Sequence, residues 1–258
     1  MTTAHGDAIA SQPATSAGTS AGTSELALDV RELNAWYGES HVLHGVDLQV
    51  PVGRTVCLLG RNGAGRSTTL RAIMGLTSAR RGSVRVFGHD LERVPPHRIA
   101  SLGVGYCPEE RGIFASLSTR ENLLLPPLLR TGFRGLSLDE IDALFPNLKE
   151  RANAPGSSLS GGEQQMLALA RILRTGARLL LLDEISEGLA PVIVQALGRA
   201  ISALRDRGFS ILLVEQNFHF SAKLADDFYV MERGRIIEQF ARDDLPHRRE
   251  QLARLLGV

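Results

Sequence analysis

One glycine-rich segment constrains the fold of this chain more than any other. The apolar run Thr55–Leu59 leads into the stretch 60–68, which reads GRNGAGRST, and a helical pattern covers 67–74. A strand, a glycine-rich turn and a helix in this order are the setting of the phosphate-binding motif G-x-x-x-x-G-K-[ST]. Glycines let the backbone approach phosphate closely, and the N–H groups at a helix start attract anions. The segment therefore predicts a nucleotide phosphate site.

The same loop contains the candidate ligands of the nucleotide. Ser67 stands where the motif places the hydroxyl that binds Mg²⁺, and Arg66 stands where the motif has lysine. A planar guanidinium is not equivalent to a compact ammonium group. The chain has only two lysines, Lys149 and Lys223, so a general preference for arginine is an alternative to a tuned site. The predicted nucleotide-binding residues of the loop are Gly60, Asn62, Gly63, Gly65, Arg66, Ser67 and Thr68.

A second strand predicts the carboxylates that such a site needs. Residues 179–184 read LLLLDE, so two acids follow a strand with the composition of a fully buried one. Ligands of open α/β sheets bind at the carboxyl ends of the strands. Asp183 is the candidate for holding Mg²⁺, and Glu184 can orient and deprotonate the attacking water as a general base. An ordinary acidic strand end is the alternative interpretation.

The segment 159–165, which reads LSGGEQQ, predicts a second anion-binding helix N-terminus. One ATP needs only one phosphate loop, so a second site implies a second nucleotide contact. Two copies related by a twofold axis would satisfy this, with Ser160, Gly161 and Gly162 of each copy contacting the other's ATP. A capped helix that binds no ligand is the alternative.

Strand and helix patterns alternate along most of the chain. Strands are predicted at 26–30, 42–50, 54–59, 82–87, 103–106, 178–182 and 210–214, and helices at 163–175, 191–207 and 217–225. Residues 117–151 are predicted to be mostly helical, with breaks at proline and glycine. This alternation is typical of a parallel α/β sheet. The segment 1–24 is rich in Ala, Gly, Ser and Thr, which predicts a disordered tail and no targeting peptide.

Composition narrows the classes of partner. A net charge of +1 gives no reason to expect nucleic acid or an acidic membrane surface as a partner. The two cysteines, Cys57 and Cys107, predict neither a disulfide framework nor a metal site, and they suit a reduced compartment. No apolar run approaches the roughly 20 residues needed to span a bilayer. Any membrane association is therefore expected to come through a partner.

Together these motifs resemble those of the ATP-binding subunits of ABC transporters. The loop 60–67 resembles Walker A, Leu159–Gln164 the signature motif and 179–184 Walker B, in the family's order, and the resemblance covers about 25–257. Four further segments resemble the second ATPase of branched-chain amino-acid importers and of urea or amide importers: 107–114, 145–151, 183–191 and 214–217. The implied fold is α/β, a P-loop NTPase core with a parallel sheet, N-terminal antiparallel β-strands and a helical insert, over 25–258 with the insert at about 113–158.

The resemblance also implies roles for three further residues. Tyr37 matches the aromatic residue that stacks on adenine, and Gln216 falls where most members have the switch histidine. Glu109 falls where most members have the lid glutamine, which gives it a catalytic role and a place among the Mg²⁺ ligands with Ser67 and Asp183. The amide of Gln216 can donate a hydrogen bond to the γ-phosphate but carries no charge. The implied cofactors are ATP and Mg²⁺.

The function implied by the resemblance is an ATP-hydrolysing motor subunit of an importer for branched-chain amino acids or a related small polar solute. The implied partners are membrane permease subunits, a second ATPase subunit or a second copy in a head-to-tail dimer, and indirectly a periplasmic solute-binding protein. The chain would then lie at the cytoplasmic face of the inner membrane. Two alternatives stay open: a nucleotide-binding module with little turnover because of Arg66, and an ABC ATPase that serves no transporter.

Overall fold

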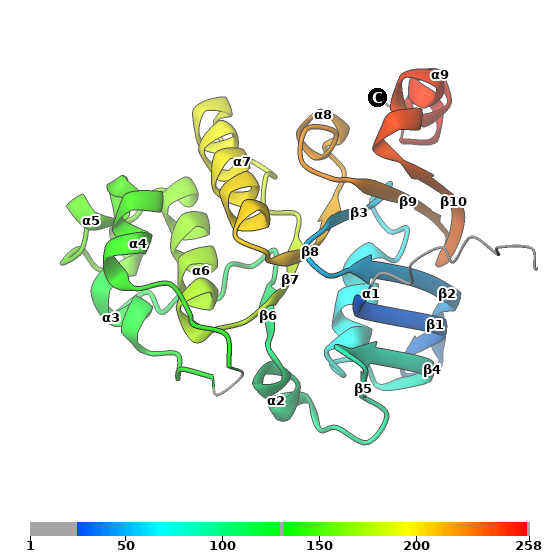
Figure 1. Ribbon diagram of the computed structural model, residues 1–258, viewed down its shortest axis with the longest axis horizontal. Helices are drawn as coiled ribbons and strands as arrows, with labels where there is room; N and C mark the ends of the chain where they lie inside the picture. The colour runs from blue at the N-terminus through cyan, green and yellow to red at the C-terminus, as the bar shows by residue number, and fades with distance from the viewer. Residues whose placement is uncertain (1–24, 130–131, 257–258) are drawn as a thin grey trace, which may run out of the picture.

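The computed structural model describes residues 25–129 and 132–256, and Figure 1 shows two β-sheets with helices packed around them. The predicted tail 1–24 lies outside these residues, so its disorder and the domain boundary at residue 25 stay predictions. None of the helices in the two described ranges is both long enough and apolar enough to cross a membrane.

The larger sheet has six strands and carries the predicted phosphate loop. In spatial order the strands are β10 (Arg235–Ala241), β9 (Asp227–Glu232), β3 (Thr55–Gly60), β8 (Ser210–Glu215), β7 (Leu179–Asp183) and β6 (Val104–Cys107). Neighbouring strands from β9 to β6 run parallel, and β10 pairs antiparallel with β9. The carboxyl ends of β3, β7 and β8 therefore lie along one edge of the sheet.

The central strands are apolar over most of their length because both faces of this sheet are covered. In β7, Leu180 and Leu182 pack into one hydrophobic cluster, while Leu179 and Leu181 pack into the other. All five residues of β7 and all six of β8 are buried. This explains why the two strands are read correctly as continuous apolar runs, since alternation appears only where one face meets water.

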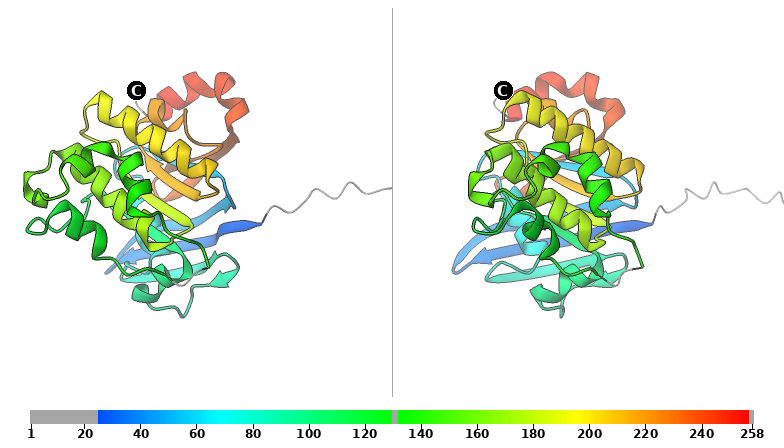
Figure 2. Two further views of the ribbon diagram at one scale, coloured as in Figure 1. Left: turned by 60° about the vertical axis from the view of Figure 1, so that its left-hand side comes forward. Right: turned by 90° about the vertical axis from the view of Figure 1, so that its left-hand side faces the viewer.

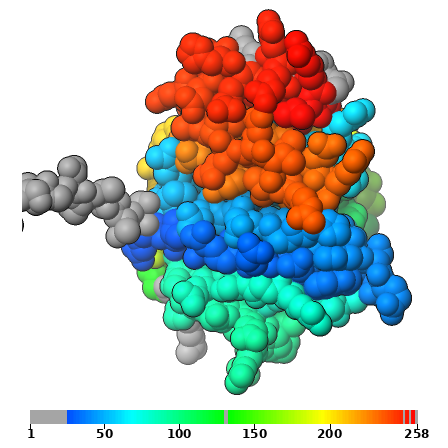
Figure 3. Space-filling view, turned by 90° about the vertical axis from the view of Figure 1, so that its right-hand side faces the viewer, coloured from blue at the N-terminus to red at the C-terminus, as the bar shows by residue number. Residues whose placement is uncertain are grey.

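The smaller sheet is antiparallel and covers one face of the larger one. Its strands, in spatial order, are β2 (Ser40–Pro51), β1 (Leu26–Tyr37), β4 (Ala79–Val86) and β5 (His89–Asp90). Helix α1 (Arg66–Ile73) places Leu70 and Ile73 in the same cluster as Leu28 and Val30 of β1. Figure 3 shows β1 and β2 as a continuous surface beneath the C-terminal strands and helix.

Helices cover the other face of the larger sheet. They are α6 (Gly161–Thr175), α7 (Pro191–Asp206), α8 (Phe218–Ser221) and α9 (Leu245–Leu256), and a short α2 (Pro96–Ile99) precedes β6. Leu169 of α6, Leu197 of α7 and Leu252 of α9 belong to one buried cluster. Figure 2 shows α6 and α7 lying against the sheet from the side of the insert. Helix α8 is shorter than the predicted 217–225.

The helical insert lies beside α6, and its described residues contain three short α-helices. These are α3 (Thr119–Leu124), α4 (Leu138–Leu144) and α5 (Pro146–Glu150). Capping boxes begin two of them, with Ser118 and Glu121 at α3 and Ser137 and Glu140 at α4. The structure has breaks at Pro126, Pro127 and Gly132 as predicted, but the segment 117–151 is less helical than expected, because the described residues of 125–137 form no helix at all. The predicted fold class is nevertheless confirmed.

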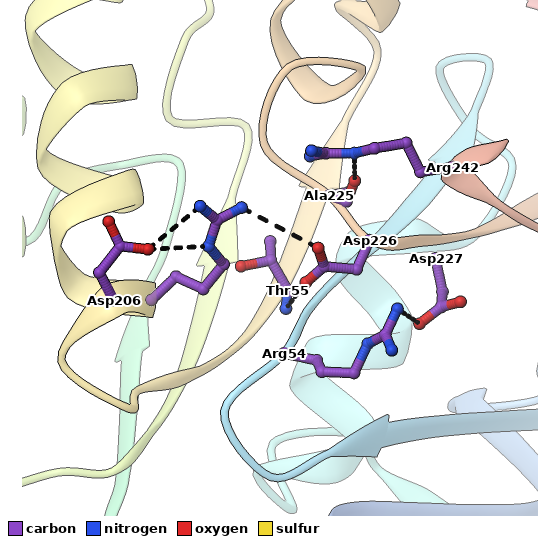
Figure 4. Close-up of polar contacts among 8 residues, drawn as sticks. Arg54, Thr55, Asp206, Ala225, Asp226, Asp227 and Arg242 are labelled. Atoms are coloured by element: carbon purple, nitrogen blue, oxygen red, sulfur yellow. Dashed lines mark hydrogen bonds and ion pairs between the residues drawn. The ribbon is translucent and has the colours of Figure 1, made fainter.

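Hydrogen bonds and an ion pair link the elements at the end of the larger sheet that lies away from the phosphate loop (Figure 4). Asp226 accepts a hydrogen bond of 2.9 Å from the Thr55 N–H and lies 3.9 Å from Arg205. Arg242 donates a hydrogen bond of 2.7 Å to the carbonyl of Ala225. These contacts connect the start of β3, the end of α7 and the segment after β10, so the sheet that supports the loop is fixed at its far end.

Candidate functional site

The phosphate loop runs from the end of β3 to the start of α1 and depends on its glycines. Gly63 and Gly65 have φ angles of 79° and 111°, in the left-handed region that favours glycine. A Cβ atom at Gly60 would lie 2.6 Å from the Met231 carbonyl oxygen of the neighbouring strand. The loop therefore turns tightly and approaches β9 closely.

Ser67 and Asp183 meet at the edge of the sheet as predicted. The Ser67 hydroxyl donates a hydrogen bond of 2.9 Å to one Asp183 oxygen, and the Tyr106 hydroxyl lies 3.4 Å from the other. Burial raises the pKa of Asp183 to about 6, and the hydrogen bond from Ser67 opposes that rise. Tyr106 received no role from the sequence, because an aromatic residue inside an apolar strand carries no mark of a site.

A hydroxyl and a carboxylate are oxygen ligands of the kind that Mg²⁺ takes beside substrate phosphates, so this pair fits the metal. The charge of Glu109 contributes to the raised pKa of Asp183, which shows that the third predicted ligand lies nearby. The described residues contain no group of three or more His, Cys, Asp or Glu side chains placed to hold a metal. The bound ion would therefore rely on nucleotide phosphates and water for most of its ligands.

Arg66 and Glu184 are in direct contact, which the sequence did not predict. One guanidinium nitrogen of Arg66 donates to the Glu184 carboxylate and, at 3.2 Å, to the side chain of Asn62. The other terminal nitrogen, Nη1, is buried and has no hydrogen-bond partner among the described residues. The side chain of Arg66 is only 3% exposed. The arginine at the lysine position thus contacts the predicted general base.

Hydrogen bonds to β8 fix the backbone at Glu184 and at Ser186, two residues further on. Glu184 has a φ of 47°, unusual for a residue other than glycine, and its N–H donates to the carbonyl of Val214 at 3.0 Å. The buried carboxylate of Glu215 accepts hydrogen bonds from the N–H and the hydroxyl of Ser186, at 3.1 and 2.8 Å. Hydrogen bonding to Glu184 raises the pKa of Glu187 to about 7. Glu215 received no role from the sequence. The signal that pointed to it was an acid directly after the apolar strand 210–214.

Glu215 should make the stability of the protein depend on pH. Burial raises the pKa of its carboxyl to about 7, so the folded state binds more protons than the unfolded state between roughly pH 4.5 and 7. Its contribution to stability therefore falls as the pH rises through that window. Relative to the wild type, Glu215→Gln should gain about 3 kcal/mol of unfolding free energy between pH 4.5 and 8.

Denaturant unfolding at both pH values measures this difference. Glu92→Gln, which changes an exposed acid in the loop after β5, is the control for general effects of pH. A Glu215→Gln variant whose stability relative to the wild type is the same at pH 4.5 and 8 would contradict the buried, shifted carboxyl.

The signature segment caps α6. The Ser160 hydroxyl accepts a hydrogen bond of 3.3 Å from the Glu163 N–H, and the Glu163 carboxylate accepts one of 2.7 Å from the Ser160 N–H. Gly162 lies against Ile193, where a Cβ atom would be 2.7 Å from the side chain. Within the described ranges, these contacts join the segment to α6 and α7 and not to the phosphate loop. Ser160 itself is exposed.

The remaining predicted residues lie around the same edge. Tyr37 ends β1 with 37% of its surface exposed, and hydrogen bonds with Tyr106 and Tyr37 hold the pKa of Arg71 on α1 above its ordinary value. Gln216 follows β8 and lines a cavity of about 1110 Å³ together with Glu184 and Glu187. The loop, both acids at the end of β7 and the residue after β8 are therefore brought together, while Ser160–Gly162 form no hydrogen bond or ion pair with any of them in the described part of the chain.

Comparison with known proteins places this geometry in context. The family model for ABC transporters matches residues 43–187. The high-affinity branched-chain amino acid transport ATP-binding protein BraG of Pseudomonas aeruginosa is 41% identical over 212 residues, 81% of this chain and 91% of that protein. The probable branched-chain amino acid transport ATP-binding protein LivF of Archaeoglobus fulgidus is 36% identical, over 80% of this chain and 88% of that protein.

Export proteins and solved structures also match. The lipopolysaccharide export system ATP-binding protein LptB of Escherichia coli K12 is 32% identical over 216 residues, 81% of this chain and 88% of that protein. A solved ATP-binding subunit of an ABC transporter superimposes with a TM-score of 0.74 at 27% identity, covering 90% of this chain and 99% of the other.

Proposed function

Because the chain belongs to the ABC transporter family and is an ATPase of that family, we propose that it is the ATP-hydrolysing motor subunit of an importer. The observation that carries the proposal is the Ser67–Asp183 contact at the phosphate loop, with Glu184 one residue further on. The similarity to BraG and LivF supports branched-chain amino acids or a related small polar solute as cargo.

Each part of the site has a role in hydrolysis. The N–H groups of the loop bind the phosphates, Tyr37 stacks on adenine, and Ser67 with Asp183 holds Mg²⁺. Bound Mg²⁺ supplies neutralisation of the phosphate charge. Glu184 takes a proton from the attacking water, and Gln216 donates a hydrogen bond to the γ-phosphate. Catalysis then comes mainly from positioning and electrostatic stabilisation.

Hydrolysis would act on the transporter through a dimer. In a head-to-tail pair with a second ATPase subunit or a second copy, Ser160–Gly162 of each subunit contacts the ATP held by the other. The exposed position of Ser160 supports this role, since its contacts leave it open to a partner. Binding of ATP closes the pair, and hydrolysis opens it, which is ligand-driven domain closure.

The helical insert offers a surface for the membrane subunits. Exposed apolar side chains gather at its start, with Phe114, Leu124, Leu125 and Leu128 between 47% and 65% exposed. Clusters of this kind mark surfaces that bind other proteins. We infer that the permease subunits dock here, which places the chain at the cytoplasmic face of the inner membrane, with the solute-binding protein acting from the periplasm.

A second candidate function is a nucleotide-binding module with little turnover. The contact of Arg66 with Glu184 favours it, because a base paired with a guanidinium is not free to accept a proton from water. The similarity to LptB makes lipopolysaccharide a further cargo to test, and export a further direction of transport. Purification of the membrane proteins that bind the chain in its own host distinguishes import from export.

Mg-ATP should stabilise the protein against heat. A ligand that binds only the folded state adds about 2.7 kcal/mol at 100 times its dissociation constant, which raises the melting temperature of a chain of this size by about 5–10 °C. Thermal unfolding with and without millimolar Mg-ATP measures the effect. Asp183→Asn is the control and should lose the part of the shift that depends on Mg²⁺. An unchanged melting temperature in the folded wild type would contradict the proposed site.

A further inference from the structure

The contact between Arg66 and Glu184 joins two groups with separate tasks in hydrolysis. Arg66 begins α1, Glu184 follows β7, and their side chains are 3% and 10% exposed. Arg66 Nη2 donates to Glu184 and to Asn62, while Nη1 is buried without a partner among the described residues. A buried donor without an acceptor costs free energy, so the guanidinium has one unmet hydrogen bond in this arrangement.

The two tasks compete. A general base needs a basic carboxylate within hydrogen-bond reach of water, and a guanidinium that donates to one carboxylate oxygen stabilises the ionised form and makes that oxygen a weaker proton acceptor. A guanidinium also matches the oxygens of a phosphate with two parallel N–H bonds. Arg66 can therefore satisfy Nη1 by turning to a phosphate, and in doing so it releases Glu184.

The surroundings favour movement of the arginine over movement of the glutamate. Glu184 is held by the bond of its N–H to Val214, and the next residue but one, Ser186, is held by Glu215. Arg66 stands at the first turn of α1 and has a long side chain whose other hydrogen bond among the described residues, to Asn62, is 3.2 Å long. A rotation of the arginine side chain needs no change in the sheet.

We propose that Arg66 is a positioning residue that restrains Glu184 until the terminal phosphates of bound ATP draw its guanidinium away. The proposal rests on the ATP site proposed above. Arginine suits this role better than lysine, because its planar guanidinium can match a carboxylate or a phosphate with two N–H bonds, whereas an ammonium group acts as a point charge. Glu184 would thereby act as a base only while the terminal phosphates of the nucleotide are bound to Arg66.

Thermal unfolding of four proteins without nucleotide tests the pair itself. These are the wild type, Arg66→Gln, Glu184→Gln and the double variant. Removing one partner leaves the other buried and unpaired, so each single variant should melt about 6–20 °C below the wild type. The double variant should melt no lower than the less stable single variant. If the decreases in melting temperature of the two single variants add up in the double variant, Arg66 and Glu184 do not interact, and the proposal is overturned.

The affinity for ATP tests the restraint and needs no hydrolysis. Calorimetric titration with Mg²⁺ and a non-hydrolysable ATP analogue, with Ser160→Arg in every protein to obstruct the ATP-bound dimer, should show about tenfold tighter binding when Glu184→Gln is present than when it is absent, because Arg66 is then free to meet the phosphates. Glu110→Gln is the control, since it removes an exposed carboxylate near the site whose hydrogen bond comes from Arg71 and not from Arg66. Equal gains in the two variants would show a general effect of charge and overturn the proposal.

The two experiments separate failure of this inference from failure of the proposed function. Normal binding of ATP with no coupling between positions 66 and 184 would overturn the restraint and leave the ATPase site intact. Coupling between the two positions with no binding of ATP by any of the variants would overturn the nucleotide site. Coupling together with the tenfold gain in Glu184→Gln alone is the expected result.

Discussion

Replacing Glu184 with glutamine is expected to lower the rate of phosphate release by at least about 10²-fold while the protein still binds ATP. The amide preserves the shape of the side chain but cannot accept a proton from the attacking water, and general-base catalysis typically contributes 10²- to 10⁴-fold. Asp183 and the phosphate loop, which hold the metal and the nucleotide in the proposed site, are unchanged. Phosphate release and ATP binding, measured on the same preparation, test both parts of this expectation.

The same variant should accumulate as an ATP-bound dimer, because the step that reopens the pair is blocked. Size-exclusion chromatography with and without Mg-ATP measures this, and Glu92→Gln, an exposed acid far along the chain from the site, controls for the loss of one charge. A Glu184→Gln variant that stays monomeric in both conditions would contradict a dimer of two copies and would point to a different ATPase subunit as the partner.

Replacing Ser160 with arginine is expected to block turnover by a similar factor and to change the affinity of the isolated subunit for ATP by less than about threefold. Ser160 makes its contacts at the start of α6 and none with its own phosphate loop in the described part of the chain. A bulky cation there would obstruct the ATP of the partner and not its own. Much weaker binding of ATP by the monomeric variant would show that the assignment across the dimer is wrong.

A mixture of two inactive variants gives the sharper form of this test. In a dimer of one Ser160→Arg subunit and one Asp183→Asn subunit, one composite site keeps an intact loop, an intact Asp183 and an intact signature segment. Mixing should therefore restore part of the phosphate release that both variants lack alone. Ser160→Ala, which removes only the hydroxyl, separates the effect of size from the loss of the hydroxyl.

The core of the fold could be predicted because each central strand meets the same environment on both faces. Leu179–Asp183 is buried along its whole length, so its sequence carries the strand signal by itself. The capping box at Ser160 is equally local, since Ser160 and Glu163 are three residues apart. The predicted breaks at Pro126, Pro127 and Gly132 are local signals of the same kind, but the extent of the non-helical segment 125–137 around them, where it is described, was not predicted.

The site divides in the same way into local and distant contributions. The glycines of the loop and the acids after β7 stand in short motifs, and the structure brings Ser67 to Asp183 as the motifs predict. The contact of Arg66 with Glu184 spans 118 positions and depends on an arginine at a position where the motif has lysine. Contacts of that kind follow from packing of the whole sheet, which no local pattern contains.

Steady-state phosphate release by the wild type and by Glu184→Gln, prepared in the same way, tests the central claim most directly. The account predicts Mg²⁺-dependent release by the wild type at a rate at least about 10² times that of the variant, with Arg66 in place. The measurement is made on the chain alone and again with the membrane subunits that bind it in its own host. A wild type that cannot be distinguished from Glu184→Gln in both settings would contradict the ATPase motor and favour the nucleotide-binding module.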